Sequence, residues 1–222
     1  MLTTLMLILT AITAYLLGSV NGAIIVSRVM FGTDVRSRGS GNAGLTNYYR
    51  SYGIPGLVTV VGIDVLKGVA GALLGGLFLS FAAPDPLREE FIDTGRLVAT
   101  FCVILGHCYP VFHGFRGGKG ILTGVSCVLV VNPQAAAIAL FIFAIIVVAT
   151  RYVSLGSIIA TLSVPVTLLA NGFSGRCMLL ALISVALIVL RHAENIRRLL
   201  NHREARISFK KDVSHKIDND SF

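Results

Sequence analysis

Apolar residues dominate the chain in long runs that short polar segments interrupt. The runs cover about 2–26, 54–82, 95–112, 121–132, 134–149, 154–171 and 177–190. Gly, Pro, Asn and charged residues separate them, as is typical of helix ends. About 20 residues of α-helix cross a hydrocarbon core ~30 Å thick. The pattern therefore predicts an all-α integral membrane protein, a bundle of seven transmembrane helices.

Two central runs leave an alternative open. The runs at 121–132 and 134–149 are shorter than the ~20 residues of a simple span. They could instead form one bent or re-entrant element, broken at Asn132–Pro133. Five crossings would then remain, with the same polarity.

Basic residues are distributed unevenly between the two sides of the predicted membrane. With the N-terminus outside and seven crossings, fifteen of the nineteen Lys and Arg residues fall inside, in 28–50, 116–119, 151 and 191–216. Positive charge gathers on the cytoplasmic side of membrane proteins. We therefore expect a cytoplasmic C-terminus. Residues 1–208 would form one transmembrane domain, and 209–222 a basic, polar, disordered tail.

Composition narrows the function classes. Hydrophobic residues make up 55% of the chain and charged residues 14%, with a net charge of +8. The bilayer accounts for the positive charge, because basic segments bind anionic lipids, so we expect membrane lipids and no nucleic acid as partners. The four cysteines and five histidines lack metal-ligand spacing. They predict buried thiols, no metal and no cofactor.

The first of three polar, glycine-rich segments on the predicted cytoplasmic side runs from Asp34 to Asn47. Its glycines, Gly41 among them, allow successive backbone N–H groups to point into one concavity. Side-chain donors in or just after it are Arg36, Ser40, Asn42, Thr46, Asn47 and Arg50. These donors predict a phosphate site. The spacing Gly39-x-Gly41-x-x-Gly44 imitates a dinucleotide fingerprint, which we reject because no strand is expected before it.

The second segment runs from Gly106 to Gly120. Gly117, Gly118 and Gly120 surround Lys119 at the expected start of a helix, where an ammonium and backbone amides favour phosphate. It is not a P-loop, which needs Gly at position 113 and Ser or Thr at position 120. For His107, a helix-end residue satisfied by hydrogen bonds is favoured over a catalytic one.

The third segment runs from Arg191 to Leu200. On a helix, His192 and Asn195 share a face and can bind phosphate or orient a hydroxyl. The alternative is an ordinary polar helix end at the membrane surface. Arg151 and Ser154 form another basic and hydroxyl pair on this side, either in the site or as an interfacial anchor.

One charged pair lies inside a predicted span. Asp64 and Lys67 are three residues apart in the run at 54–82. We expect an intramembrane ion pair with a structural role rather than direct chemistry.

These motifs, in this order, resemble the acyl-phosphate-dependent glycerol-3-phosphate acyltransferases of bacteria, the PlsY family. The resemblance runs through 16–19, 39–47, 64–68, 106–120, 151–155 and 192–199. It implies a seven-helix enzyme of the bacterial plasma membrane, with its site facing the cytoplasm. The implied reaction transfers a fatty acyl group from acyl phosphate to glycerol 3-phosphate, giving lysophosphatidate and phosphate, the first step of phospholipid synthesis. The oligomeric state stays open, and a monomer is compatible.

The resemblance also implies roles for individual residues. Those implied in substrate binding or transition-state stabilisation are Ser40, Asn42, Arg50, Lys119, Ser154, His192 and Asn195. The chain departs from the family pattern at four positions, with Leu45 for the usual Ala, His113 for an aromatic, Arg116 for Lys and His202 for Gly.

The residues also favour a mechanism. No Asp stands five positions after His107, His113, His192 or His202, so the His-x-x-x-x-Asp dyad of thioester-dependent acyltransferases is not found there. An acyl phosphate carries a good leaving group, so holding two anions in place can suffice. We expect Lys119, Arg50 and the glycine-rich amides to neutralise phosphates, and His192 and Asn195 to orient the glycerol. The alternatives are a transporter for a small anion and a noncatalytic lipid-binding subunit.

Overall fold

A computed structural model describes residues 1–207 as a helical bundle without strands. Ten α-helices and three short 3₁₀ turns follow one another along this part of the chain. They are α1 (Leu2–Ser19), α2 (Gly22–Phe31), η1 (Val35–Ser37), α3 (Leu45–Tyr52), α4 (Leu57–Ser80), η2 (Asp85–Leu87), α5 (Arg88–Cys108), η3 (Val111–His113), α6 (Ile121–Val131), α7 (Pro133–Thr150), α8 (Val153–Ala170), α9 (Gly175–Arg191) and α10 (Ala193–Leu200). The tail predicted at 209–222 lies outside the described residues.

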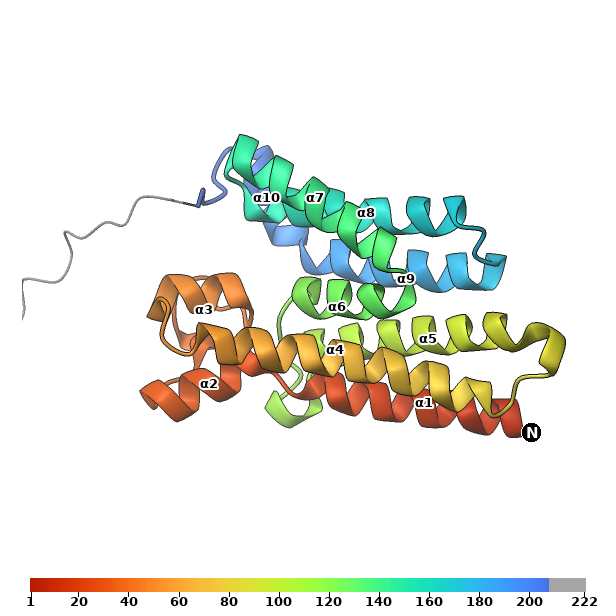
Figure 1. Ribbon diagram of the computed structural model, residues 1–222. Coiled ribbons are helices and arrows are strands. Elements are labelled where there is room, and N and C mark those ends of the chain that lie inside the picture. The colour runs from red at the N-terminus through yellow and green to blue at the C-terminus, as the bar shows by residue number, and fades with distance from the viewer. Residues whose placement is uncertain (208–222) are drawn as a thin grey trace, which may run out of the picture.

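The chain is an integral membrane protein by the length and hydropathy of its helices. Five segments are long and apolar enough to cross a bilayer, and six if α9 and α10, bent by 58°, count as one span. The helix α6 is apolar but has 11 residues, fewer than the ~20 of a simple span. In Figure 1 its junction with α7 lies part-way along the bundle, short of the turn between α8 and α9.

Helix α5 is the centre of the bundle and packs against α1, α4, α6 and α9. Small residues allow the closest approach. A Cβ built on Gly75 of α4 would stand 2.4 Å from the carbonyl oxygen of Gly95 of α5, and one on Gly95 would stand 2.2 Å from that of Gly75. The two backbones touch, as is common where membrane helices pack without a hydrophobic driving force.

The first apolar run is broken in two. Helix α1 ends at Ser19, and the Asn21 side chain caps α2 by accepting a 3.0 Å hydrogen bond from the Ile24 amide. The predicted Asp64–Lys67 ion pair forms at this break, with 2.8 Å between Lys67 Nζ and Asp64 Oδ1. Lys67 also donates to the Val20 carbonyl at 2.7 Å. The pair therefore satisfies backbone groups that the break exposes inside the bundle.

The polar segments gather at one end of the bundle. Figure 1 shows α2, α3 and α10 at the end opposite to the N-terminus. The chain passes this end between α5 and α6, between α7 and α8, and after α9. Loops that are far apart in sequence thus meet there.

Candidate functional site

Two cavities open at this end of the bundle. A deep cavity of about 540 Å³ runs down between α5, α6, α7, α8 and α9. A polar vestibule of about 880 Å³ lies between the two glycine-rich loops and the start of α10. The residues that line both are Ser40, Asn42, Lys119, Asn195 and Arg198. The cavities therefore meet at side chains from all three polar segments.

Most of the predicted site residues lie on these walls. The deep cavity is lined by Ser40, Asn42, Thr46, Asn47, Arg50, Lys119, Gly120, Ser154, His192 and Asn195. Arg36, Gly41 and Gly117 line the vestibule. Gly118 and Arg151 line neither cavity. Arg151 instead ends α7 in a left-handed conformation, and its carbonyl accepts a 2.9 Å hydrogen bond from the Ile207 amide.

A hydrogen-bond network joins the second and third segments. Lys119 Nζ donates to Asn195 Oδ1. Asn195 Nδ2 donates to Glu204 Oε1 at 2.7 Å, and the Ser154 hydroxyl donates to the same oxygen at 2.7 Å. Arg198 Nε donates to Glu204 Oε2 at 2.7 Å. Glu204 therefore holds the ends of α8 and α10 together and fixes Asn195 beside Lys119.

Sequence reasoning missed Glu204 and Arg198 as site residues. Their signal was present, since Glu204 is one of two acidic residues between 191 and 207 and Arg198 lies three residues after Asn195. On a helix that spacing puts Arg198 on the face of Asn195.

His192 is 2% exposed and its tautomer follows from its partner. Its Nδ1 lies 2.8 Å from the Ile188 carbonyl oxygen. A carbonyl can only accept, so Nδ1 carries the proton and Nε2 is left as an acceptor on the wall of the deep cavity. His107 is different, because its Nδ1 contacts Lys67 Nζ at 2.9 Å and Thr123 Oγ1 at 3.3 Å. This agrees with the prediction of a histidine satisfied by hydrogen bonds.

The glycine-rich loops use several of their own amides in internal hydrogen bonds. The amides of Ser40, Gly41 and Gly44 donate to Asn47 Oδ1 and to the carbonyls of Arg38 and Asn42. The amides of Gly117 and Gly118 donate to the carbonyls of Cys108 and His107. These five amides already have acceptors within the chain, and phosphate binding by the glycine-rich loops stays a prediction. A Cβ on Gly117 would stand 2.0 Å from the His107 carbonyl, so this glycine allows close packing instead.

Asn47 organises the first loop. It is 3% exposed, and its Nδ2 donates to the carbonyls of Val35, Arg38 and Asn42 at 3.0–3.1 Å. Its Oδ1 accepts from the Ser40 amide at 2.9 Å. The side chain therefore shapes the loop rather than presenting free donors to the cavity.

Free amides are supplied by helix N-termini. The deep cavity is lined by the first residues of α3 (Leu45 and Thr46), α6 (Ile121 and Leu122) and α8 (Val153 and Ser154). The vestibule is lined by Ala193, the first residue of α10. First-turn amides have no partner within their own helix, and the helix dipole favours an anion there. Three helices thus begin on the wall of the deep cavity, and a fourth begins on the wall of the vestibule.

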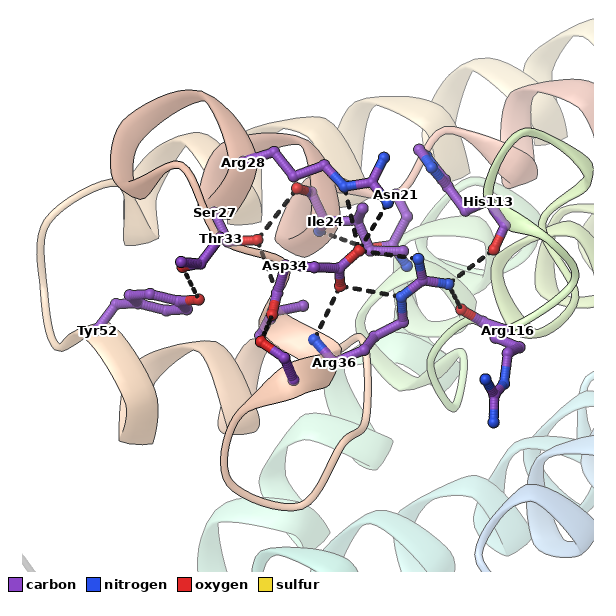
Figure 2. Close-up of polar contacts among 12 residues, drawn as sticks. Asn21, Ile24, Ser27, Arg28, Thr33, Asp34, Arg36, Tyr52, His113 and Arg116 are labelled. Carbon is purple, nitrogen blue, oxygen red and sulfur yellow. Dashed lines mark hydrogen bonds and ion pairs between the residues drawn. The ribbon is translucent and has the colours of Figure 1, made fainter.

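Arg36 connects the two glycine-rich loops (Figure 2). Its Nη1 donates to the carbonyls of His113 and Arg116 at 2.7 and 2.8 Å. Its Nε and Nη2 donate to Asp34, which also accepts from Arg28 at 2.7 Å. The hydrogen bond from Arg36 keeps the pKa of Asp34 well below its usual range. The guanidinium therefore links the two loops, and most of its N–H groups already donate hydrogen bonds within the protein.

Lys119 places a partly buried ammonium at the junction of the two cavities. Burial lowers its pKa to about 8, although the charge of Glu204 acts in the opposite direction. The ammonium therefore stays charged near neutral pH but is poorly solvated, which strengthens its attraction to an anion.

In the described part of the chain, no three His, Cys, Asp or Glu side chains could hold a metal ion together.

The deep cavity is apolar below its polar end. Its walls include Leu97 and Ile104 of α5, Val128 of α6, Phe143 of α7 and Val185 of α9. A polar end that opens into an apolar tube suits an amphipathic molecule with a charged head and a hydrocarbon chain.

Comparison with known proteins identifies the family. The family model described as glycerol-3-phosphate acyltransferase matches residues 8–202. The chain belongs to the PlsY family of glycerol-3-phosphate acyltransferases. It is 40% identical over 208 residues to the glycerol-3-phosphate acyltransferase of Thermoanaerobacter sp. (strain X514), covering 93% of this chain and 98% of the relative. It is 39% identical over 194 residues to that of Aquifex aeolicus, covering 87% and 95%.

Solved PlsY structures have the same fold. The crystal structure of PlsY (YgiH) in its glycerol 3-phosphate form is 36% identical, with a TM-score of 0.79, covering 91% of this chain and 96% of that one. The lysophosphatidic acid form is also 36% identical, with a TM-score of 0.76, covering 91% and 95%. Because the chain belongs to this family, it is an enzyme. The two alternative functions, a transporter and a noncatalytic lipid-binding subunit, are therefore excluded.

Proposed function

We propose that the protein transfers a fatty acyl group from acyl phosphate to glycerol 3-phosphate, giving lysophosphatidate and inorganic phosphate. One observation carries the proposal. The largely apolar deep cavity, which is lined by the N-termini of three helices, meets the polar vestibule at Lys119. The hydrocarbon chain of the donor fits the first space and glycerol 3-phosphate the second, which brings both phosphates to the junction. The relatives solved with glycerol 3-phosphate and with lysophosphatidic acid support these ligands.

The donor is inferred from the chemistry of the junction. It holds the cationic side chains of Lys119 and Arg198, and no carboxylate is paired with His192, whose Nδ1 bonds the Ile188 carbonyl. The spacing His-x-x-x-x-Asp occurs at His215 and Asp220, outside the described residues and after the match to the family model ends at 202. A mixed anhydride needs positioning and charge stabilisation more than a strong base. Acyl phosphate therefore suits the site better than a thioester.

The proposed roles are supported by the positions and contacts of the residues. Lys119, Arg50 and the first-turn amides neutralise the phosphates, while Ser40, Asn42, Thr46 and Ser154 supply further polar contacts. His192 Nε2 accepts the hydrogen of the attacking glycerol hydroxyl and orients it. Asn195 Oδ1 accepts a hydrogen bond from Lys119, and Asn195 Nδ2 donates one to Glu204. Asn195 therefore positions the ammonium rather than the glycerol.

The reaction then needs no cofactor. The glycerol oxygen attacks the acyl carbonyl, the bond from carbonyl carbon to phosphate oxygen breaks, and phosphate leaves. The hydroxyl proton passes to a substrate phosphate. Lys119 stabilises the charge that gathers on the departing phosphate.

Turnover by the purified protein tests the proposal. Glycerol 3-phosphate is supplied with palmitoyl phosphate or with palmitoyl-CoA, and lysophosphatidate and phosphate are measured. We expect product with the acyl phosphate alone. Product with the thioester alone would overturn the donor, and no product with either would overturn the reaction.

We also propose that the site faces the cytoplasm of a bacterial plasma membrane, with the N-terminus outside and residues 1–208 forming one domain. The clustering of basic loops at the site end supports this polarity, with α6 and α7 together leaving and returning to that end. The native cysteines are free and buried, as the sequence predicted, so background labelling is low. A membrane-impermeant maleimide should label Arg88→Cys, but not Arg116→Cys, in intact cells. The reverse pattern would overturn the polarity.

A further inference from the structure

The far end of the deep cavity, which we call its floor, is lined by apolar residues. Leu97 of α5, Val128 of α6 and Ala181 of α9 line it and are at most 7% exposed. They belong to one hydrophobic cluster with Val131, Ala135, Ala136, Leu168 and Cys177, none of which lines the cavity. The cavity therefore stops where this packed cluster begins.

The depth of the cavity is set by the helices that line it. Along α9 and its end, the lining runs from His192 at the polar end of the cavity to Ala181, eleven positions away. At ~1.5 Å per residue this is about 16 Å. Along α5 it runs from His107 to Leu97, ten positions and about 15 Å. Two separate helices thus give the same depth.

That depth corresponds to a hydrocarbon chain of limited length. An extended chain advances about 1.2 Å per bond, since three backbone bonds span ~3.3–3.6 Å. Roughly a dozen carbons therefore fit between the junction and the floor, and further carbons press on the floor residues. Close-packed clusters resist added volume, so a longer chain must bend or leave the tube.

We propose that Leu97, Val128 and Ala181 set the acyl-chain length that the enzyme transfers most efficiently. The inference rests on the proposed function, because the acyl chain must occupy the deep cavity. Ala181 is the most informative position, since its small side chain borders the cavity and extra carbons there would project into the tube. Leu97 should act in the opposite direction, because a shorter side chain at this position makes the cavity deeper.

The test is a chain-length profile of kcat/KM with acyl phosphates of 8 to 18 carbons. Burial of one methylene changes kcat/KM about fourfold, equivalent to ~0.8 kcal/mol. Ala181→Leu should lower the value for the sixteen-carbon donor at least about tenfold, while the ten-carbon donor changes less than about twofold. Leu97→Ala should shift the preference toward longer chains. Ala186→Leu makes the same change on the same helix at an exposed position and should keep the wild-type profile.

Binding of lysophosphatidates with 10 to 18 carbons supplies a second measurement, read as the rise in melting temperature. Because it requires no donor, it separates failure of this proposal from failure of the proposed reaction. If the wild-type protein uses only the thioester, the donor is wrong, and the lysophosphatidate series still tests the floor. If Ala181→Leu does not fold, Ala181→Val replaces it. Wild-type length dependence in both Ala181 and Leu97 variants would overturn the proposal.

Discussion

The Arg36 guanidinium donates a 2.7 Å hydrogen bond to the carbonyl oxygen of His113, 77 positions later in the chain. It bonds the Arg116 carbonyl as well, three residues before Lys119. The first glycine-rich loop thus fixes the second, and with it the ammonium at the junction of the cavities. A lysine has the same charge but lacks the planar fork that reaches Asp34 and two carbonyls together.

Arg36→Lys should therefore lower kcat/KM for glycerol 3-phosphate about tenfold, since each lost charge-assisted hydrogen bond is worth ~1.5–3 kcal/mol and part of that loss reaches Lys119. Steady-state kinetics in one detergent provide the measurement. Arg28→Lys is the matched control, because Arg28 also bonds Asp34 but has a half-exposed side chain and no bond to the second loop. Equal losses in the two variants would contradict a positioning role.

Lys119→Ala should reduce kcat at least ~100-fold, because one charged donor that stabilises a developing anion is worth about that much. Arg197→Ala removes an equal charge from the exposed side of α10, outside both cavities, and should leave kcat near the wild-type value. Melting temperatures show whether each variant is folded. Near wild-type turnover by folded Lys119→Ala protein would remove Lys119 from the mechanism.

The value of kcat/KM should decrease as the pH rises above 8. Burial lowers the pKa of Lys119 to about 8, and a lysine loses its positive charge as pH rises through its pKa. The second pKa of a phosphate monoester lies near ~6, so substrate ionisation does not produce this limb. kcat should fall at a higher pH, because bound phosphate stabilises the ammonium. An active Lys119→Arg variant should show no decrease of kcat/KM up to pH 10. If that variant shows the same decrease as the wild-type protein, the decrease belongs to a group other than Lys119.

Glu204→Gln should lower both stability and activity. The Glu204 side chain is 8% exposed and accepts hydrogen bonds from Ser154, Asn195 and Arg198. An amide replaces one acceptor oxygen by a donor and loses the charge-assisted bond to Arg198, which costs ~1.5–3 kcal/mol. Thermal unfolding measures this loss. Glu194→Gln, on a side chain that is 90% exposed, should change little, and equal melting temperatures for the two variants would contradict the proposed network.

Hydropathy predicted the helices well because the bilayer leaves the backbone few choices. Inside hydrocarbon each span must satisfy its own N–H and C=O groups, so long apolar runs become helices. The run at 2–26 was an exception and broke at Val20 and Asn21. The break became possible because Lys67 and Asp64, from a later run, contact its exposed backbone groups. A contact 47 positions away has no local signal.

The sequence predicted many of the residues that line the candidate site, but not which acceptor each hydrogen-bond donor bonds. The sequence placed Ser40, Asn42, Lys119 and Asn195 in three separate polar segments, and the fold brings them to one junction. It could not show that five loop amides donate to acceptors in their own chain. Which acceptor an amide finds depends on loop conformation, and here Asn47 decides much of it.

The Asp64–Lys67 pair should show strong coupling in a double-mutant cycle. The two side chains are 2% and 4% exposed. Lys67→Met leaves an uncompensated carboxylate and an unpaired Val20 carbonyl, which should cost ~3–5 kcal/mol of unfolding free energy. Combining it with Asp64→Leu removes both charges, so the double variant should be less destabilised than the sum of the single variants. The partly exposed pair Asp93 and Arg96, with side chains 25% and 29% exposed and the same spacing on α5, is the control and should couple by no more than ~1 kcal/mol. Additive losses at Asp64 and Lys67 would mean that neither charge depends on the other inside the membrane.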